Sequence, residues 1–141
     1  MTTSAQAVAF LLFLLAANPG AHADSITVTP GKWEVVTSVQ MPMLPGPRVE
    51  KTTECVKTGE LSPGDFLDDS DDCKLTRQTV NGNTLSWELQ CDVEGGQAKG
   101  AGSFTANDSI GNGTMRMEMP IQGHPFAVLT SWQAKRIGDC D

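Results

Sequence analysis

Residues 73–91 read CKLTRQTVNGNTLSWELQC, and this segment has the pattern of a β-hairpin. The tripeptide at 81–83, Asn-Gly-Asn, favours a tight turn because Asn and Gly readily adopt positive φ. In the second arm, from Leu85 to Cys91, apolar and polar residues alternate with the period of a strand that buries one face. The segment therefore predicts two antiparallel strands with one apolar face.

The cysteine content predicts two disulfides. The chain has four cysteines, Cys55, Cys73, Cys91 and Cys140. An even number of cysteines is typical of the disulfide framework of short exported chains, and four cysteines allow three pairings. Zinc sites require ligands at short spacing, such as C-x-x-C, and no two of these cysteines are that close.

The register of the hairpin favours one of the three pairings. If the loop comprises residues 81–83, Cys73 lies directly opposite Cys91, and Leu75 lies opposite Leu89. This register predicts a Cys73–Cys91 bridge and leaves Cys55 to pair with Cys140. A two-residue Asn-Gly loop would shift the register by one residue and weaken the argument.

The rest of the chain is also dominated by strand patterns. Apolar residues alternate along 33–41, and the Pro-rich segment 42–47 ends that strand. Residues 58–67 allow a turn of helix at most, and an acidic loop follows at 68–72. Further strands are expected at 48–56, 98–105, 114–119 and 126–137. Six or seven short strands predict a single small antiparallel all-β domain, as a curved sheet, an open barrel or a sandwich.

The N-terminal segment differs from everything that follows it. An apolar run from Val8 to Ala17 is too short to span a membrane, and small residues surround Ala23. We interpret residues 1–23 as a signal peptide cleaved after Ala23, which leaves residues 24–141 as one domain. A buried N-terminal helix is the competing interpretation, because Met1 to Gln6 contains no Lys or Arg.

Several motifs together resemble one known family. They are the opening Pro30-Gly31-Lys32-Trp33-Glu34-Val35, the Met- and Pro-rich segment 41–47, Cys55, the central hairpin 73–91, Gly113-Thr114-Met115, and the ending Ile137-Gly138-Asp139-Cys140. In this order they resemble the domain-of-unknown-function family numbered 3617, small exported proteins of Gram-negative bacteria. The resemblance implies a periplasmic location and an all-β fold, and it implies no activity.

The charge of the chain excludes some classes of partner. The net charge is −7, and every charged residue lies in 24–141. An acidic protein repels phosphate backbones, so we expect no nucleic acid partner. No basic amphipathic stretch is present to hold it on anionic lipid, and no stable membrane anchor is expected. We expect a periplasmic monomer.

The sequence argues against catalysis. His124 is the only imidazole in 24–141, and it lies in a Gly-His-Pro turn without a G-x-S-x-G motif nearby. Paired cysteines provide no thiolate nucleophile. We therefore predict that the protein is not an enzyme, and we expect no catalytic residue and no cofactor.

Two kinds of metal site are weighed against simpler interpretations. Met115, Met117, Met119 and His124 supply soft ligands that suit Cu(I) or Ag(I), although alternate methionines on a strand also serve as core residues. Core packing is the preferred interpretation, and soft-metal binding is the alternative. The aspartates of 65–72 lack the spacing of an EF-hand loop, which favours a solvated loop over a Ca²⁺ site.

The third class of function is binding. A curved sheet with Trp33, Trp87 and Trp132 on its concave face could hold a small apolar ligand, or the tryptophans could simply form the core. A pocket of several hundred Å³ between them would favour a ligand, and close packing would favour an envelope partner or a structural role. The sequence thus predicts a non-catalytic binding or interaction module.

Overall fold

The computed structural model describes residues 24–67 and 72–141. The predicted signal peptide, residues 1–23, and most of the predicted acidic loop lie outside the described residues. Within the described part there is no helix long and apolar enough to cross a membrane.

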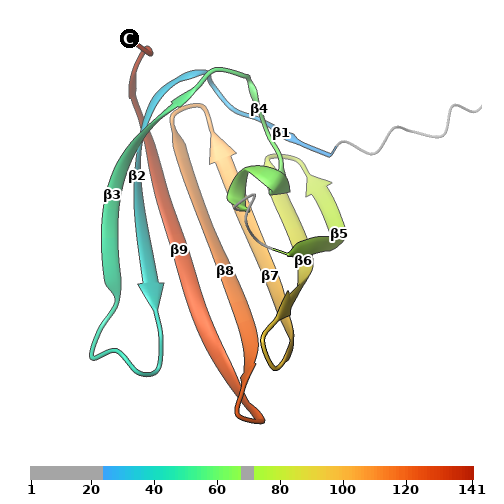
Figure 1. The fold of residues 1–141 in the computed structure, drawn as a ribbon. Helices are drawn as coiled ribbons and strands as arrows, with labels where there is room; N and C mark the ends of the chain where they lie inside the picture. Colours follow the sequence, from blue (N-terminus) through green and yellow to red (C-terminus); the bar gives the residue numbers. More distant parts are fainter. Residues whose placement is uncertain (1–23, 68–71) are drawn as a thin grey trace, which may run out of the picture.

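Most of the described chain forms one antiparallel sheet of seven strands (Figure 1). The sheet has the order β3-β2-β9-β8-β7-β6-β5, so β3 and β5 are its edges. Its strands are β2 (Gly31–Gln40), β3 (Arg48–Val56), β5 (Cys73–Asn81), β6 (Thr84–Val93), β7 (Gly96–Asn107), β8 (Ile110–Ile121) and β9 (His124–Gly138). The sheet is strongly curved and not closed, so the curved open sheet is the correct one of the three predicted architectures.

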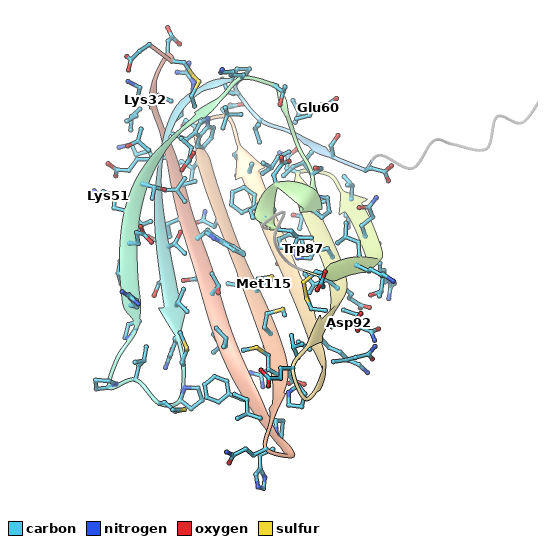
Figure 2. The ribbon with its side chains drawn as sticks, in the orientation of Figure 1. Lys32, Lys51, Glu60, Trp87, Asp92 and Met115 are labelled. Carbon is cyan, nitrogen blue, oxygen red and sulfur yellow. A yellow bond between two sulfur atoms is a disulfide. The ribbon has the colours of Figure 1, made fainter. Side chains whose placement is uncertain are left out.

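The alternation of residues gives the sheet one apolar and one polar face. On β6 the side chains of Leu85, Trp87 and Leu89 are buried, while those between them are more exposed. The apolar side chains lie on the concave face, and the labelled Trp87 and Met115 both lie there (Figure 2). This period-two burial is the pattern that the sequence predicted.

Glycines in β7 and β8 let aromatic rings lie directly over the backbone. A Cβ at Gly102 would lie 2.5 Å from Cζ2 of Trp87, and a Cβ at Gly113 would lie 2.5 Å from Cδ2 of Phe104. The glycine at 113 was expected to precede the strand, yet β8 begins at Ile110 and runs to Ile121. The expected start at 114 was wrong because Gly111 and Gly113 belong to the strand, where their missing side chains leave room for the ring of Phe104.

The central hairpin pairs as expected at its base, but its turn was predicted incorrectly. Asn81 pairs with Thr84, so the loop has two residues, Gly82-Asn83. That register alone would place Cys73 one residue away from Cys91. A β-bulge between Leu75 and Arg77 absorbs one residue and restores the pairing of the two cysteines, whose Cα atoms lie 4.0 Å apart.

A short segment covers part of the concave face. Two strands, β1 (Ile26–Thr27) and β4 (Glu60–Leu61), form a small second sheet, and a single 3₁₀ turn, η1 (Pro63–Phe66), follows (Figure 1). At the start of η1 the backbone N–H of Ser62 donates a hydrogen bond to Oδ2 of Asp65 (2.7 Å). We refer to residues 57–67 as the cover segment, because its apolar side chains pack onto the core of the sheet.

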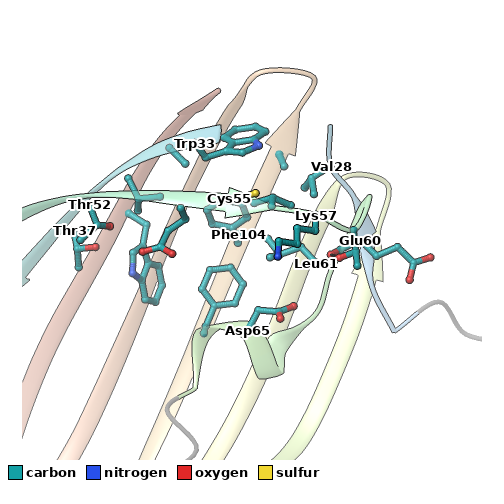
Figure 3. A pocket seen from close by; sticks show the side chains of 18 residues that line it. Val28, Trp33, Thr37, Thr52, Cys55, Lys57, Glu60, Leu61, Asp65 and Phe104 are labelled. Atoms are coloured by element: carbon teal, nitrogen blue, oxygen red, sulfur yellow. Dashed lines mark hydrogen bonds between the residues drawn. The ribbon is translucent and has the colours of Figure 1, made fainter. Parts of the chain in front are cut away.

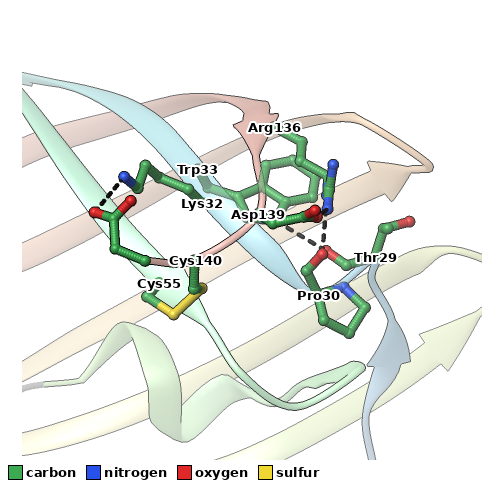
Figure 4. Close-up of a disulfide and its surroundings, with 9 residues drawn as sticks. Thr29, Pro30, Lys32, Trp33, Cys55, Arg136, Asp139 and Cys140 are labelled. Carbon is green, nitrogen blue, oxygen red and sulfur yellow. Dashed lines mark hydrogen bonds and ion pairs between the residues drawn. A yellow bond between two sulfur atoms is a disulfide. The ribbon is translucent and has the colours of Figure 1, made fainter.

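The two ends of the domain are fastened to each other (Figure 4). The Arg136 guanidinium donates to the carbonyl of Pro30 (2.8 Å) and pairs with Asp139 (2.5 Å). Gly31, with φ +145°, leaves room for that guanidinium, with which a Cβ would collide. The Cys55–Cys140 disulfide then joins the edge strand β3 to the C-terminus. The opening and ending motifs of the sequence are therefore one structural unit.

Candidate functional site

A cavity of about 580 Å³ lies on the concave face, between the β2–β3 hairpin and the cover segment (Figure 3). Its floor is formed by β2, β7 and β9, and β3 forms one wall. The opposite wall is formed by the cover segment together with Val28. Segments from both ends of the described chain therefore contribute to a single site.

Four aromatic side chains give the cavity an apolar interior. They are Trp33 on β2, Phe66 on η1, Phe104 on β7 and Trp132 on β9. Trp33 is held in place by a hydrogen bond from its Nε1 to the carbonyl of Thr29 (3.0 Å). The ring centroid of Phe66 lies 5.1 Å from that of Phe104 and 5.2 Å from that of Trp132. These contacts within the protein hold the aromatic walls of the cavity in place without a ligand.

Charged groups lie at the same cavity. Its lining includes the carboxylates of Glu54, Glu60 and Asp65, and the ammonium of Lys57. Figure 3 shows Lys57, Glu60 and Asp65 on the side of the cover segment. Glu54 lies on β3, opposite Trp33 in the β2–β3 ladder.

The cavity stays open because its outer wall is an edge strand. Along β3 only Thr52 and Val56 are partly buried, and the other side chains are exposed. The cover segment contacts the central strands instead, where Phe66 stacks on Trp87 at 4.9 Å with an interplanar angle of 17°. The sheet and its cover therefore meet over β6 and β7 and remain apart beneath β3.

The three tryptophans do not share one role. Trp33 and Trp132 line the cavity, whereas Trp87 is 2 % exposed and is not among the lining residues. Trp87 is a core residue, and its Nε1 has no hydrogen-bond partner among the described residues. The sequence placed all three tryptophans on one face, but it could not separate the two that line the cavity from the one that the cover segment buries.

The methionines of the soft-metal alternative lie on β8. Met115, Met117 and Met119 are half-buried and pack against the core of the sheet. Neighbouring members of this row lie two residues apart on one strand, roughly 7 Å. His124 is exposed and pairs with Ile121, beyond the pair formed by Met119 and Phe126. The packing of the methionines fits the core interpretation, and metal binding stays a prediction.

Of the other sequence candidates, Cys55 and Asp65 line the cavity, and the rest lie away from it or outside the described residues. His124 is eight residues from Trp132 along β9, roughly 26 Å in a strand. All four cysteines are paired, as Cys55–Cys140 and Cys73–Cys91. Three of the aspartates considered for Ca²⁺ lie in 68–71, outside the described residues, and the described residues contain no cluster of three or more His, Cys, Asp or Glu able to hold a metal ion.

Sequence reasoning missed two of the four aromatic residues of the site, Phe66 and Phe104, and the charged residues Glu54, Lys57 and Glu60. Phe66 lies in a segment predicted to form a turn of helix at most, and an aromatic residue among Ser, Pro, Gly and Asp was the available signal. Phe104 was assigned to a strand, but its ring contacts depend on the neighbouring glycines of β8. Both residues enter the site through contacts between elements distant in sequence.

Comparison with known proteins agrees with the motif resemblance. The model of one family, described as a protein of unknown function (DUF3617), matches residues 28–140. No curated protein and no solved structure matches the chain. The matched region contains every strand of the main sheet and both disulfides. The chain therefore belongs to the DUF3617 family.

Proposed function

We propose that the protein is a non-catalytic binding module that holds a small apolar ligand in the cavity of its concave face. The observation that carries this proposal is about 580 Å³ of space between Trp33, Phe66, Phe104 and Trp132. Ligand pockets usually measure roughly 300–1,000 Å³ and are lined mainly by apolar and aromatic side chains. Protein cores are otherwise closely packed, and empty volume in them lowers stability.

The chemistry of the lining supports binding over catalysis. The lining residues include neither a histidine nor a free thiol, because Cys55 is part of a disulfide. Histidine is the side chain most often used as a general acid or base, and a free thiol is a strong nucleophile. The ionisable groups of the lining are instead the exposed side chains of Glu54, Glu60, Asp65 and Lys57. The aromatic walls, in contrast, provide apolar area of the kind that ligands bury.

The proposal is tested by filling the cavity with one side chain. Thr37 lines the cavity from β2, and Ser38, the next residue, points to the convex face. A neutral, environment-sensitive naphthylamine dye is titrated into the wild-type protein and into the variants Thr37→Phe and Ser38→Phe. We expect saturable binding with fluorescence energy transfer from Trp33 and Trp132, and a loss of affinity of roughly tenfold or more in Thr37→Phe alone.

The matched variants make the outcome specific. Both introduce the same ring at half-buried positions of one strand, so a general loss of stability affects them alike. Thermal unfolding of each variant verifies that it is folded at the temperature of the titration. The proposed function would be contradicted if the wild type showed no saturable dye binding, or if Thr37→Phe bound the dye as tightly as the wild type.

A further inference from the structure

The charges around the cavity restrict the class of ligand. We propose that the ligand is an organic cation with an apolar body, such as an alkylammonium or another lipophilic amine; this inference rests on the proposed binding function. The lining carries three carboxylates, those of Glu54, Glu60 and Asp65, and one ammonium, that of Lys57. An apolar ligand with a positive end therefore meets an excess of negative charge where the cavity opens.

Among the described residues these carboxylates form no ion pair with a basic side chain. None of the three lies within 4.0 Å of a Lys or Arg nitrogen among the described residues. The segments outside the described residues, 1–23 and 68–71, contain no Lys or Arg that could pair with them. Their negative charge is thus available to a ligand.

Carboxylates on the convex face of the same sheet behave differently. Glu34 pairs with Lys51 at 3.2 Å, Glu118 with Arg116 at 3.1 Å, and Glu88 with Arg77 at 3.9 Å. Asp92, on the same face, has no such partner among the described residues, so pairing on the convex face is frequent but not complete. At the cavity, three carboxylates share the lining with one ammonium, that of Lys57, and this excess of negative charge is what favours a cationic ligand.

Aromatic rings lie next to the carboxylates on both walls. Glu54 is directly opposite Trp33 in the antiparallel β2–β3 ladder, where Cβ atoms are about 5 Å apart. Asp65 precedes Phe66 in η1, and its Oδ2 accepts hydrogen bonds from the N–H (2.7 Å) and hydroxyl (3.0 Å) of Ser62, which fix the carboxylate. A cation attracted by either carboxylate can also contact an aromatic ring, and cation–π attraction favours that placement.

An anionic ligand, such as a fatty acid, fits the lining less well. Its carboxylate could approach Lys57, but the three carboxylates of the lining would repel it. The net charge of −7 adds to this repulsion at low ionic strength. Substitution of Lys57 therefore distinguishes the two classes of ligand, because it should weaken the binding of an anion but not that of a cation.

The test compares three amphiphiles that share one alkyl chain and differ in charge. Decyltrimethylammonium, decanol and decanoate are titrated below their micelle concentrations, with calorimetry and tryptophan fluorescence as readouts. We expect the cation to bind about tenfold more tightly than the anion at low salt, and the ratio to shrink at high salt as the exposed charges are screened. Decanol should lie between them.

Three variants assign the effect to the cavity. Glu54→Gln should weaken binding of the cation by roughly threefold to tenfold without changing that of decanol. Glu88→Gln removes the same charge from the convex face and should change neither. Lys57→Gln should leave the cation bound at least as tightly as in the wild type.

The possible outcomes separate this inference from the proposed function. If decanol binds, and decanoate binds as tightly as decyltrimethylammonium or more tightly, the inference is overturned and the proposed function stands. The site would instead be an anion site if Lys57→Gln lowered the affinity for decanoate while Glu54→Gln left the affinity for decyltrimethylammonium unchanged. Failure of all three amphiphiles to bind would overturn both.

Discussion

Replacing Phe66 with alanine should test how the cover segment is held on the concave face of the sheet. Its ring contacts three others, with centroid distances of 4.9 Å to Trp87, 5.1 Å to Phe104 and 5.2 Å to Trp132. No other residue of the cover segment contributes an aromatic ring. Phe66→Ala therefore removes the main apolar connection between the cover segment and the central strands.

The expected cost follows from these contacts. A buried Phe→Ala substitution costs about 3–5 kcal/mol, and an aromatic pair adds about 0.5–1.5 kcal/mol beyond the area it buries. Phe66 is only partly buried and borders the cavity, which reduces the transfer contribution. We expect the free energy of unfolding to fall by about 2–4 kcal/mol. A domain of this size has about 5–15 kcal/mol, so the variant should still fold.

Urea unfolding at 25 °C, followed by tryptophan fluorescence, measures this change. The folded Phe66→Ala variant should also emit at longer wavelength, because Trp87 is 2 % exposed and loses its stacking partner. Phe126→Ala is the matched control. Phe126 is half-buried on β9, faces Met119, and has no aromatic partner among the described residues.

The reasoning would be refuted by equal losses of stability in the two alanine variants. It would also be refuted by an unchanged emission maximum in Phe66→Ala, because that result would mean that Trp87 is protected by something else. Phe66→Leu refines the interpretation. It restores apolar volume without the stacked ring, so recovery of most of the lost stability would assign the effect to burial.

Four further predictions follow from individual contacts. The double substitution Cys73→Ala and Cys91→Ala should lower the free energy of unfolding by about 2–5 kcal/mol, and an unchanged urea midpoint would show that the bridge is not stabilising. Gly102→Ala should lower the free energy of unfolding by about 1–3 kcal/mol in the same assay, because the new Cβ would lie 2.5 Å from Trp87. Gly46 has nothing within 4 Å of its Cβ position, so Gly46→Ala should change that free energy by no more than about 0.5 kcal/mol, and similar losses in the two variants would contradict the reasoning. Native mass spectrometry after addition of Ag(I) should show no stoichiometric adduct, since the methionines of β8 pack against the core, and an adduct that Met117→Leu abolishes would establish the soft-metal alternative. The mass of the protein recovered from the periplasm of a Gram-negative host should correspond to a chain that begins at Asp24, and retention of residues 1–23 would refute the predicted cleavage.

Local sequence patterns predicted the seven strands of the main sheet, but not β1 or β4, and they predicted the correct pairing of the cysteines. The alternation from Leu85 to Cys91 reports directly on burial, because neighbouring residues of a strand face opposite sides. The predicted pairing of Cys73 with Cys91 agrees with the structure although the predicted turn does not. The loop is one residue shorter than predicted, which shifts the register by one residue, and the bulge in β5 shifts it back. The number of residues between the two cysteines is the same with or without these two changes, so it cannot reveal them.

The cavity could not be predicted because it depends on contacts between distant segments. Nothing in the sequence around Phe66 indicates that its ring stacks on Trp87, about twenty residues later, while the β3 wall stays open. The sequence also left the curved sheet, the barrel and the sandwich undecided. That choice depends on whether the two edge strands meet, which strand patterns do not encode.

A single curved sheet explains why this domain contains a cavity at all. Its convex face is polar and can remain in water, but its concave face is apolar and needs a second layer. In the described ranges, 24–67 and 72–141, the cover segment and the residues around Ile26 supply that layer. Phe66 brings the end of the cover segment close to β6 and β7, whereas most side chains of the edge strand β3 stay exposed. The space left beneath β3 is bounded by the rings of the core and by carboxylates of the edge strand and the cover segment. An apolar interior and an acidic opening therefore arise from the same incomplete layer.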